Sequence, residues 1–85
     1  ELTIEKLTRV EKAEAYLMPL QCKHLRVRSH GDIARIELGS EELTKIMAEP
    51  FKTQLIAYFK KLGFKFVTLD LEGYRTGSLN EVLQK

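Results

Sequence analysis

Three arginines at alternating positions carry the clearest potential for chemistry in this sequence. Arg26 and Arg28 are two residues apart, and Arg35 follows after a short glycine-containing segment. A guanidinium can donate two parallel hydrogen bonds to a phosphate or carboxylate, so three on one small surface suggest a bound anion. The alternative is a solvated surface on which Arg pairs with Glu. The arginines alone leave both interpretations open.

A second potential anion site lies near the end of the chain. Arg75 stands between Gly73 and Gly77, and the capping box Ser78-Leu79-Asn80-Glu81 predicts that a short helix begins directly afterwards. An arginine beside the free N–H groups of a helix N-terminus can hold an anion. The same residues also make an ordinary strand-to-helix turn.

Three carboxylates could act as acceptors or general bases beside these arginines: Glu14, Glu37 and Asp70. Glu14 is the unusual one, because at about 100° per residue it falls between Leu7 and Val10 in the apolar stripe of a predicted helix. A carboxylate in that position is costly unless it is paired. We expect Glu14 to point at the arginine cluster or a shared ligand, or to reach round to solvent.

A predicted β-hairpin over residues 25–38 must position the arginines. Its turn falls at His30-Gly31 or Gly31-Asp32, since both dipeptides supply the positive φ that a tight hairpin needs. Either turn puts the three arginines and Glu37 on one face. The other face is then core, formed by Leu25, Val27, Ala34, Ile36 and Leu38.

The helix before the hairpin is expected to begin after an N-cap at Thr3 and to run to about Leu20. Its basic residues are expected on the outer side, away from the core. They are Lys6, Arg9 and Lys12.

The rest of the sequence predicts an α+β fold in the order α-β-β-α-α-β-α, with a small three-stranded sheet and helices mainly on one face. Ser40 is expected to cap one helix, Pro50 to open the next and Gly63 to follow it. The third strand is predicted over 64–71 and is expected to be well buried. It should run parallel to the second strand and lie beside the first, giving the order 2-1-3.

The composition bounds the class of protein. Eighty-five residues predict one domain spanning 1–85, and 14 basic against 12 acidic side chains give a net charge of +2, too balanced for nonspecific nucleic-acid binding. The single cysteine excludes an intrachain disulfide, and with two histidines it leaves no credible zinc set. We expect a cytoplasmic protein without a membrane span, cut from a longer chain because it opens on Glu1.

Self-contained catalytic motifs are absent from the sequence. There is no P-loop, no Gly-x-Gly-x-x-Gly and no Gly-x-Ser-x-Gly. Cys22 and His24 could form a thiolate–imidazole pair, but a nucleophilic cysteine also needs an orienting group and an oxyanion site. A structural cysteine is the simpler interpretation.

Two long motifs resemble one known family. The segments 25–37 and 67–81, preceded by the helical pattern of 4–14, closely resemble the C-terminal part of the LarE-like ATP-dependent sacrificial sulfur transferases. The resemblance covers nearly the whole chain.

The resemblance implies a PP-loop ATPase whose N-terminal domain binds ATP with Mg²⁺. Such enzymes adenylylate a pyridinium biscarboxylate mononucleotide and then displace AMP with a cysteine, and their product feeds a nickel-pincer cofactor. Both the loop and the reactive cysteine belong to sequence upstream of Glu1, so Cys22 does not inherit that role. This chain is therefore expected to carry no cofactor, no metal and no catalytic residue of its own.

The resemblance also assigns binding residues. Glu14, Arg26 and Arg28 match positions at a substrate and phosphate site between the two domains. Arg35, Glu37, Asp70 and Arg75 lie in the shared motifs and are further candidates for substrate or phosphate binding.

We therefore expect a substrate-binding and assembly domain that is inactive alone, in a parent that forms a homo-oligomer. The alternative is a non-enzymatic anion-binding or oligomerisation module of a PP-loop protein. RNA binding is a third and weaker hypothesis, because the sheet face lacks the exposed aromatic residues that stack bases. The true substrate and the source of sulfur, a sacrificial cysteine or a cluster, stay open.

Overall fold

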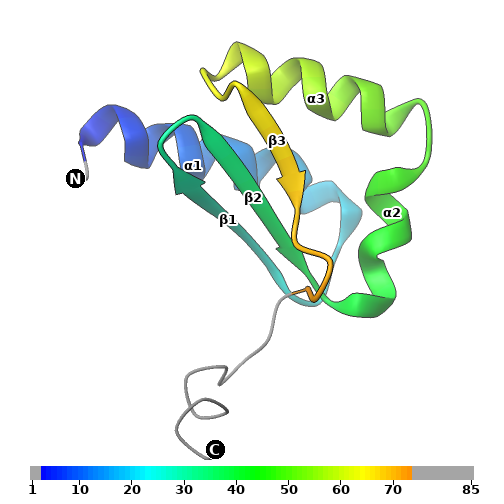
Figure 1. Ribbon diagram of the computed structural model, residues 1–85. Helices are drawn as coiled ribbons and strands as arrows, with labels where there is room; N and C mark the ends of the chain where they lie inside the picture. Colours follow the sequence, from blue (N-terminus) through cyan, green and yellow to red (C-terminus); the bar gives the residue numbers. More distant parts are fainter. Residues whose placement is uncertain (1–2, 74–85) are drawn as a thin grey trace, which may run out of the picture.

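A computed structural model describes residues 3–73, in which three helices lie beside a three-stranded sheet, mainly against one face (Figure 1). The predicted α+β order is confirmed through the third strand. The final helix, expected from Ser78, lies outside the described residues. The elements are α1 (Ile4–Leu17), η1 (Met18–Leu20), β1 (Leu25–His30), β2 (Ile33–Leu38), η2 (Ser40–Glu42), α2 (Leu43–Met47), α3 (Phe51–Lys61) and β3 (Phe66–Leu69).

Helix α1 begins as its sequence predicts. The hydroxyl of Thr3 accepts a hydrogen bond from the Lys6 N–H at 3.1 Å, which satisfies one of the donors left open at a helix start. The α-helix ends at Leu17, earlier than expected. The segment that contains Pro19 continues as the 3₁₀ turn η1.

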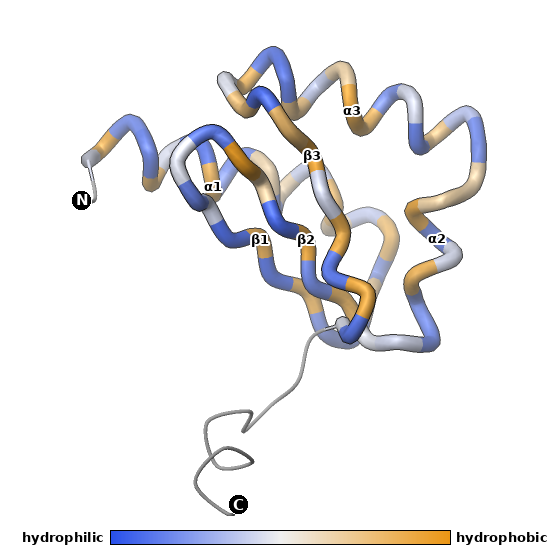
Figure 2. The backbone as a smooth tube through the Cα atoms, in the orientation of Figure 1, coloured by the Kyte–Doolittle hydropathy of each residue, from blue (hydrophilic) through white to orange (hydrophobic). Residues whose placement is uncertain are grey.

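The hairpin has the second of the two predicted turns. Gly31 has φ +61° between β1 and β2, and His30 pairs with Ile33 across Gly31-Asp32. In this register Arg28 lies opposite Arg35, so the predicted division into a charged face and a core face is confirmed. Hydropathy accordingly alternates along β1 and β2 (Figure 2).

The predicted strand order is wrong. Strand β3 is parallel to β2, as expected, but it lies beside β2, and the order is β1-β2-β3. The outer edge of β1 is not open to a third strand, because Glu14 on α1 accepts a hydrogen bond from the Val27 N–H there at 2.9 Å. The chain returning through α2 and α3 therefore adds to the other edge of the hairpin (Figure 1).

Strand β3 is also shorter and more exposed than predicted. It covers Phe66–Leu69, and Phe66 retains 60% of its exposed surface. Phe64, which was assigned to the strand, precedes it and is buried in the core, whereas Leu71 follows it and is 82% exposed. An edge strand covered on one face leaves its alternate side chains in solvent, which explains the difference.

The core lies between the sheet and the helices. Among the described residues its buried apolar members are Ala13, Leu17, Val27, Ala34, Ile36, Leu38, Ile46, Leu55, Phe59 and Phe64. Tyr16 extends this layer by stacking on Tyr58, with ring centroids 4.5 Å apart. Within residues 3–73, no helix is long and apolar enough to cross a membrane.

The residues predicted to stand at the ends of the later helices are partly confirmed. Gly63 follows the C-cap of α3 with φ +113°, the left-handed conformation that favours glycine. Ser40 is not a helix cap. It starts η2, whose N-cap is Gly39, and no side chain caps that turn or α2.

The core predicts a strong contrast between two positions on α3. Replacing Phe59, which is fully buried, by Ala should lower the free energy of unfolding by about 3–5 kcal/mol, through lost burial and the cavity left behind. Ile56→Ala, at a partly exposed position on the same helix, should cost about 1 kcal/mol or less. Urea unfolding followed by circular dichroism measures both, and equal losses would contradict this core.

Candidate functional site

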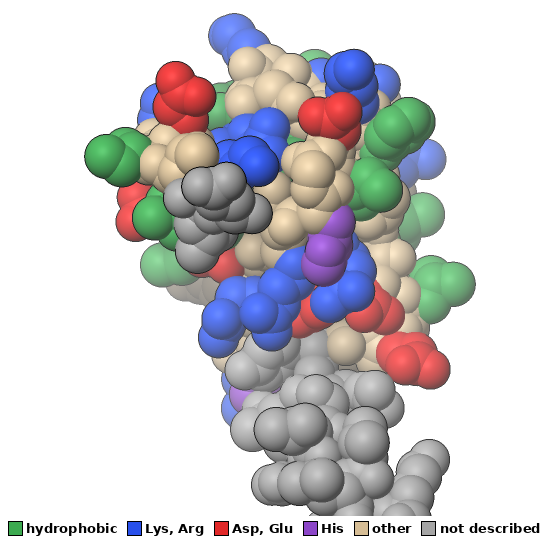
Figure 3. Space-filling view, turned by 60° about the vertical axis from the view of Figure 1, so that its left-hand side comes forward, with side chains coloured by type: hydrophobic (Ala, Val, Ile, Leu, Met, Phe, Trp, Pro, Cys, Tyr) green, Lys and Arg blue, Asp and Glu red, His purple; other side chains and the backbone are tan. Residues whose placement is uncertain are grey.

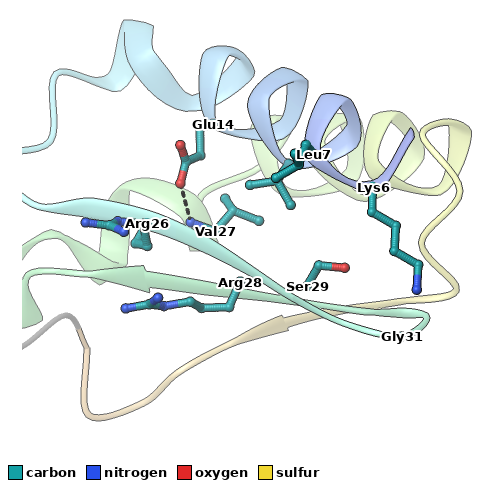
Figure 4. A pocket seen from close by; sticks show the side chains of 9 residues that line it. Lys6, Leu7, Glu14, Arg26, Val27, Arg28, Ser29 and Gly31 are labelled. Carbon is teal, nitrogen blue, oxygen red and sulfur yellow. Dashed lines mark hydrogen bonds between the residues drawn. The ribbon is translucent and has the colours of Figure 1, made fainter. Parts of the chain in front are cut away.

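A groove of about 580 Å³ runs between α1 and the outer edge of β1 (Figure 4). Apolar side chains of both elements form its walls, and charged side chains stand at its rim. It is lined by Lys6, Leu7, Val10, Glu14, Arg26, Val27, Arg28, Ser29 and Gly31. Three of the residues singled out from the sequence, Glu14, Arg26 and Arg28, are thus brought together.

Glu14 has a backbone partner that the sequence did not predict. Its carboxylate is half-buried and points from α1 to β1, where Oε2 accepts a hydrogen bond from the Val27 N–H (Figure 4). The bond satisfies an edge-strand donor that would otherwise face the groove unpaired. This explains how a carboxylate is tolerated in the apolar stripe: it is paired with backbone.

Arg26 and Arg28 are exposed side chains on neighbouring outward positions of β1. In the close view they extend along the strand, away from the turn at Gly31 (Figure 4). The space-filling view shows basic side chains gathered on this side of the molecule with acidic ones beside them (Figure 3). The groove therefore has a cationic rim at one end and apolar walls along its length.

A second charged cluster lies on the open face of the sheet. Glu37 is 7% exposed, and its two oxygens are shared between two arginines. Oε1 lies 3.3 Å from Nε of Arg28, and Oε2 lies 2.7 Å from Nη2 of Arg35. Arg35 is also 3.8 Å from Asp70 at the end of β3, through Nε and Oδ2.

This cluster explains how like charges are accommodated in the hairpin. Arg28 and Arg35 face each other directly across the two strands, an arrangement that destabilises a sheet unless it is compensated. Glu37 supplies the compensation, so the pairing of Arg with Glu, which the sequence left open, is present here. No external anion is required between these two arginines.

The candidates therefore divide into two sets. Glu14, Arg26 and Arg28 line the groove, whereas Arg35, Glu37 and Asp70 form the open-face cluster, with Arg28 belonging to both. Arg75 lies outside the described residues. Within residues 3–73, no group of three His, Cys, Asp or Glu is arranged to hold a metal ion.

Two basic residues of α1 face the hairpin and were wrongly expected on the outer side. Lys6 lines the groove near the turn (Figure 4). Arg9 donates to Ser29 Oγ at 3.1 Å, to the Gly31 carbonyl at 2.9 Å and to the Gly63 carbonyl at 3.3 Å. Helical periodicity could not reveal this, because long side chains reach partners that are distant in sequence.

Glu42 is a further buried carboxylate that sequence reasoning missed. The Lys23 N–H donates to its Oε2 at 2.8 Å, which fixes the segment leading into β1. That hydrogen bond lowers the pKa of Glu42; burial opposes the shift, and the His24 N–H and Lys45 add to it. Lys23 and Glu42 are 19 positions apart, so no local sequence pattern predicts this contact.

Cys22 does not have the environment of a reactive thiol. Burial raises the pKa of the thiol, and the Glu42 carboxylate raises it further, against an opposing effect of Lys45. A nucleophilic cysteine needs the opposite shift. The structural interpretation of Cys22 is therefore favoured over the thiolate–imidazole pair.

Together, the fold and the groove define a small α+β domain whose hairpin edge is cationic. A surface of this class is suited to binding anions.

No protein-family model matches the chain. Over 85 residues it is 47% identical to an uncharacterized protein of Synechocystis sp., of which it covers 32%. It is 40% identical over 84 residues to pyridinium-3,5-bisthiocarboxylic acid mononucleotide synthase of Lactiplantibacillus plantarum, of which it covers 30%.

A third relative, an uncharacterized protein of Methanocaldococcus jannaschii, is 38% identical over 76 residues, 89% of this chain and 29% of that protein. The chain thus spans about a third of the length of the relatives it matches. The second of these relatives, the pyridinium-3,5-bisthiocarboxylic acid mononucleotide synthase, is a LarE protein. Nearly the whole of this chain is similar to it, and the coverage fits the C-terminal part of a LarE-like protein.

The open-face cluster predicts a specific cost for losing Glu37. Glu37→Gln should lower the free energy of unfolding by about 1–3 kcal/mol, because two guanidiniums would then face each other without their buried partner. Glu11→Gln makes the same change of charge at an exposed position of α1 and should change stability by less than about 0.5 kcal/mol. Equal unfolding free energies in urea for the two variants would contradict the role of Glu37.

Glu42 predicts a dependence of stability on pH. Because its pKa is lower in the folded chain than in the unfolded one, its contribution is present above the unfolded value and is lost as the pH falls through the folded value. Below about pH 4.3 the wild type should therefore lose stability more steeply than Glu42→Gln. Thermal midpoints measured from pH 3 to pH 6 test this, and parallel curves would contradict it.

Proposed function

We propose that this chain is the substrate- and phosphate-binding domain of a longer LarE-like sulfur transferase, and that it is inactive alone. One observation carries the proposal: the groove between α1 and β1 brings Glu14, Arg26 and Arg28 to one site from two elements. The likeness to a pyridinium-3,5-bisthiocarboxylic acid mononucleotide synthase supports the same ligand class. The ligand would be a carboxylated pyridine mononucleotide.

The chemistry of the groove suits such a ligand. Arg26 and Arg28 are guanidinium forks at the rim and would hold the phosphate. Leu7 and Val10 offer an apolar wall to a flat ring. Glu14 already accepts from the Val27 N–H, and a carboxylate has capacity for further donors, such as a ribose hydroxyl.

The open-face cluster would have a supporting role. Glu37 is a carboxylate bonded to Arg28 and Arg35, and it would repel a phosphate placed between them. We therefore assign Arg35, Glu37 and Asp70 to positioning Arg28 rather than to direct ligand contact. Arg75 keeps its assignment from the sequence motif as a candidate phosphate contact.

The parent's remaining chemistry would lie in the part of the relatives that this chain does not match. ATP with Mg²⁺ would bind there, in an N-terminal PP-loop domain that adenylylates the substrate carboxylate before sulfur is transferred. This domain would be the principal partner of the present chain. We propose a cytoplasmic enzyme of nickel-pincer cofactor synthesis that assembles as a homo-oligomer.

An assembly module is the second candidate. On the open sheet face, Ile33 and Phe66 pair across β2 and β3, and they are 39% and 60% exposed. Exposed apolar side chains beside a self-compensated charged cluster favour a protein contact. In this alternative the chain would bind anions or mediate oligomerisation without contributing to catalysis.

Phosphate binding tests the groove directly. On titration with AMP or a pyridine mononucleotide, NMR shifts should concentrate at Glu14, Arg26 and Arg28. Arg26→Gln with Arg28→Gln should weaken binding by about tenfold or more, since two charge-assisted contacts are lost. A matched control, Lys60→Gln with Lys61→Gln, removes two charges from α3 and should leave the affinity within about twofold.

Shifts confined to other residues would refute the site. In the full-length parent, reversing the charges of Arg26 and Arg28 separates the two candidates. Lost turnover with intact assembly supports the substrate-binding domain. Lost assembly with unchanged substrate affinity supports the assembly module.

A further inference from the structure

Hydrogen bonds join α1 to the hairpin at both ends of the groove. At one end Glu14 accepts from the Val27 N–H. At the other end Arg9 donates to Ser29 and to the Gly31 carbonyl. Along α1, Val10 of the apolar wall lies between Arg9 and Glu14, and the two sets of contacts hold β1 against the helix.

Arg9 makes contacts beyond those with the hairpin. Its guanidinium reaches three segments, because it also donates to the Gly63 carbonyl between α3 and β3. The guanidinium carbon lies 4.1 Å from the centre of the Phe64 ring, a cation–π contact with a buried core residue. Arg9 thus ties the hairpin turn to the core as well as to α1.

The backbone of Gly63 lies close to the guanidinium of Arg9. A Cβ built on Gly63 would stand 3.2 Å from Nη1 of Arg9, and the φ of +113° is itself unsuited to other residues. Packing from this side and the hydrogen bonds that Arg9 donates to Ser29 and Gly31 hold the guanidinium in one place. A planar fork of five donors suits this arrangement, whereas a lysine ammonium cannot reach all the acceptors at once.

We propose that Arg9 is the positioning residue of the groove: it holds the β1–β2 hairpin against α1 so that Arg26 and Arg28 stay at the rim. This rests on the proposed function, in which the groove binds a phosphate. Arg9 itself does not touch the ligand. It acts through Ser29 and Gly31, which line the groove.

The test compares variants that preserve charge. Arg9→Lys keeps the positive charge but loses the fork, and Lys12→Arg is the matched control on the exposed side of the same helix. With inorganic phosphate as the probe, Arg9→Lys should weaken binding by about tenfold, the loss expected for a charged hydrogen bond. The dependence of affinity on salt should not change, since no charge is lost. Lys12→Arg should bind as the wild type does.

A double-mutant cycle with Ser29→Ala shows whether Arg9 acts through Ser29. Ser29→Ala alone should weaken phosphate binding by about twofold to threefold, and the double variant should bind no more weakly than Arg9→Lys. If the two effects multiply, Ser29 contacts phosphate independently and the proposed route is wrong. Wild-type affinity in Arg9→Lys would overturn the proposal outright. If Arg9→Lys fails to fold, the phosphate affinity of Ser29→Ala is the deciding measurement. An unchanged affinity in Ser29→Ala then overturns the proposal.

Hydrogen exchange separates this proposal from the proposed function. If the wild type itself does not bind phosphate, the proposed function fails. The positioning role is then measured at the hairpin amides, which should exchange about tenfold faster in Arg9→Lys than in Lys12→Arg. Equal exchange rates would refute the positioning role whatever the groove binds.

Discussion

The register of the β1–β2 hairpin is the constraint on which the rest of the structure depends. It places Arg28 directly opposite Arg35, and the buried carboxylate of Glu37 joins the two. A slip of one residue would turn every side chain of a strand to the other face, burying guanidiniums and exposing Val27 and Ile36. The charged cluster and the apolar core therefore specify the same register from opposite faces of the sheet.

Helix α1 makes use of that register. Its apolar residues Ala13 and Leu17 pack on the core face, while Glu14 and Arg9 bond to the β1 edge and the turn. The edge that would otherwise accept another strand is thereby covered. Covering the edge with a helix also creates the groove, so strand order and candidate site have one cause.

The two charged clusters illustrate why local charge is an incomplete guide to binding. Three arginines on one face suggested an anion, yet Arg35 is compensated by Glu37 and Asp70. Arg28 shares Glu37 with Arg35 but also lines the groove, as Arg26 does. The spatial neighbours of each charged side chain therefore have to be known before that side chain can be assigned to a binding site.

The sequence by itself determined the local structure of the chain. Alternation over 25–38 predicted the hairpin and its faces, and Thr3 and Gly63 marked the start of α1 and the end of α3, because capping and turn chemistry act between near neighbours. It also placed Glu14, Arg26 and Arg28 in one candidate site. Only the tertiary structure decided that β3 joins β2, that Phe66 is exposed, and that Arg9 and Glu42 bond to distant backbone. Those outcomes depend on contacts between residues 19 to 54 positions apart, which no local period encodes.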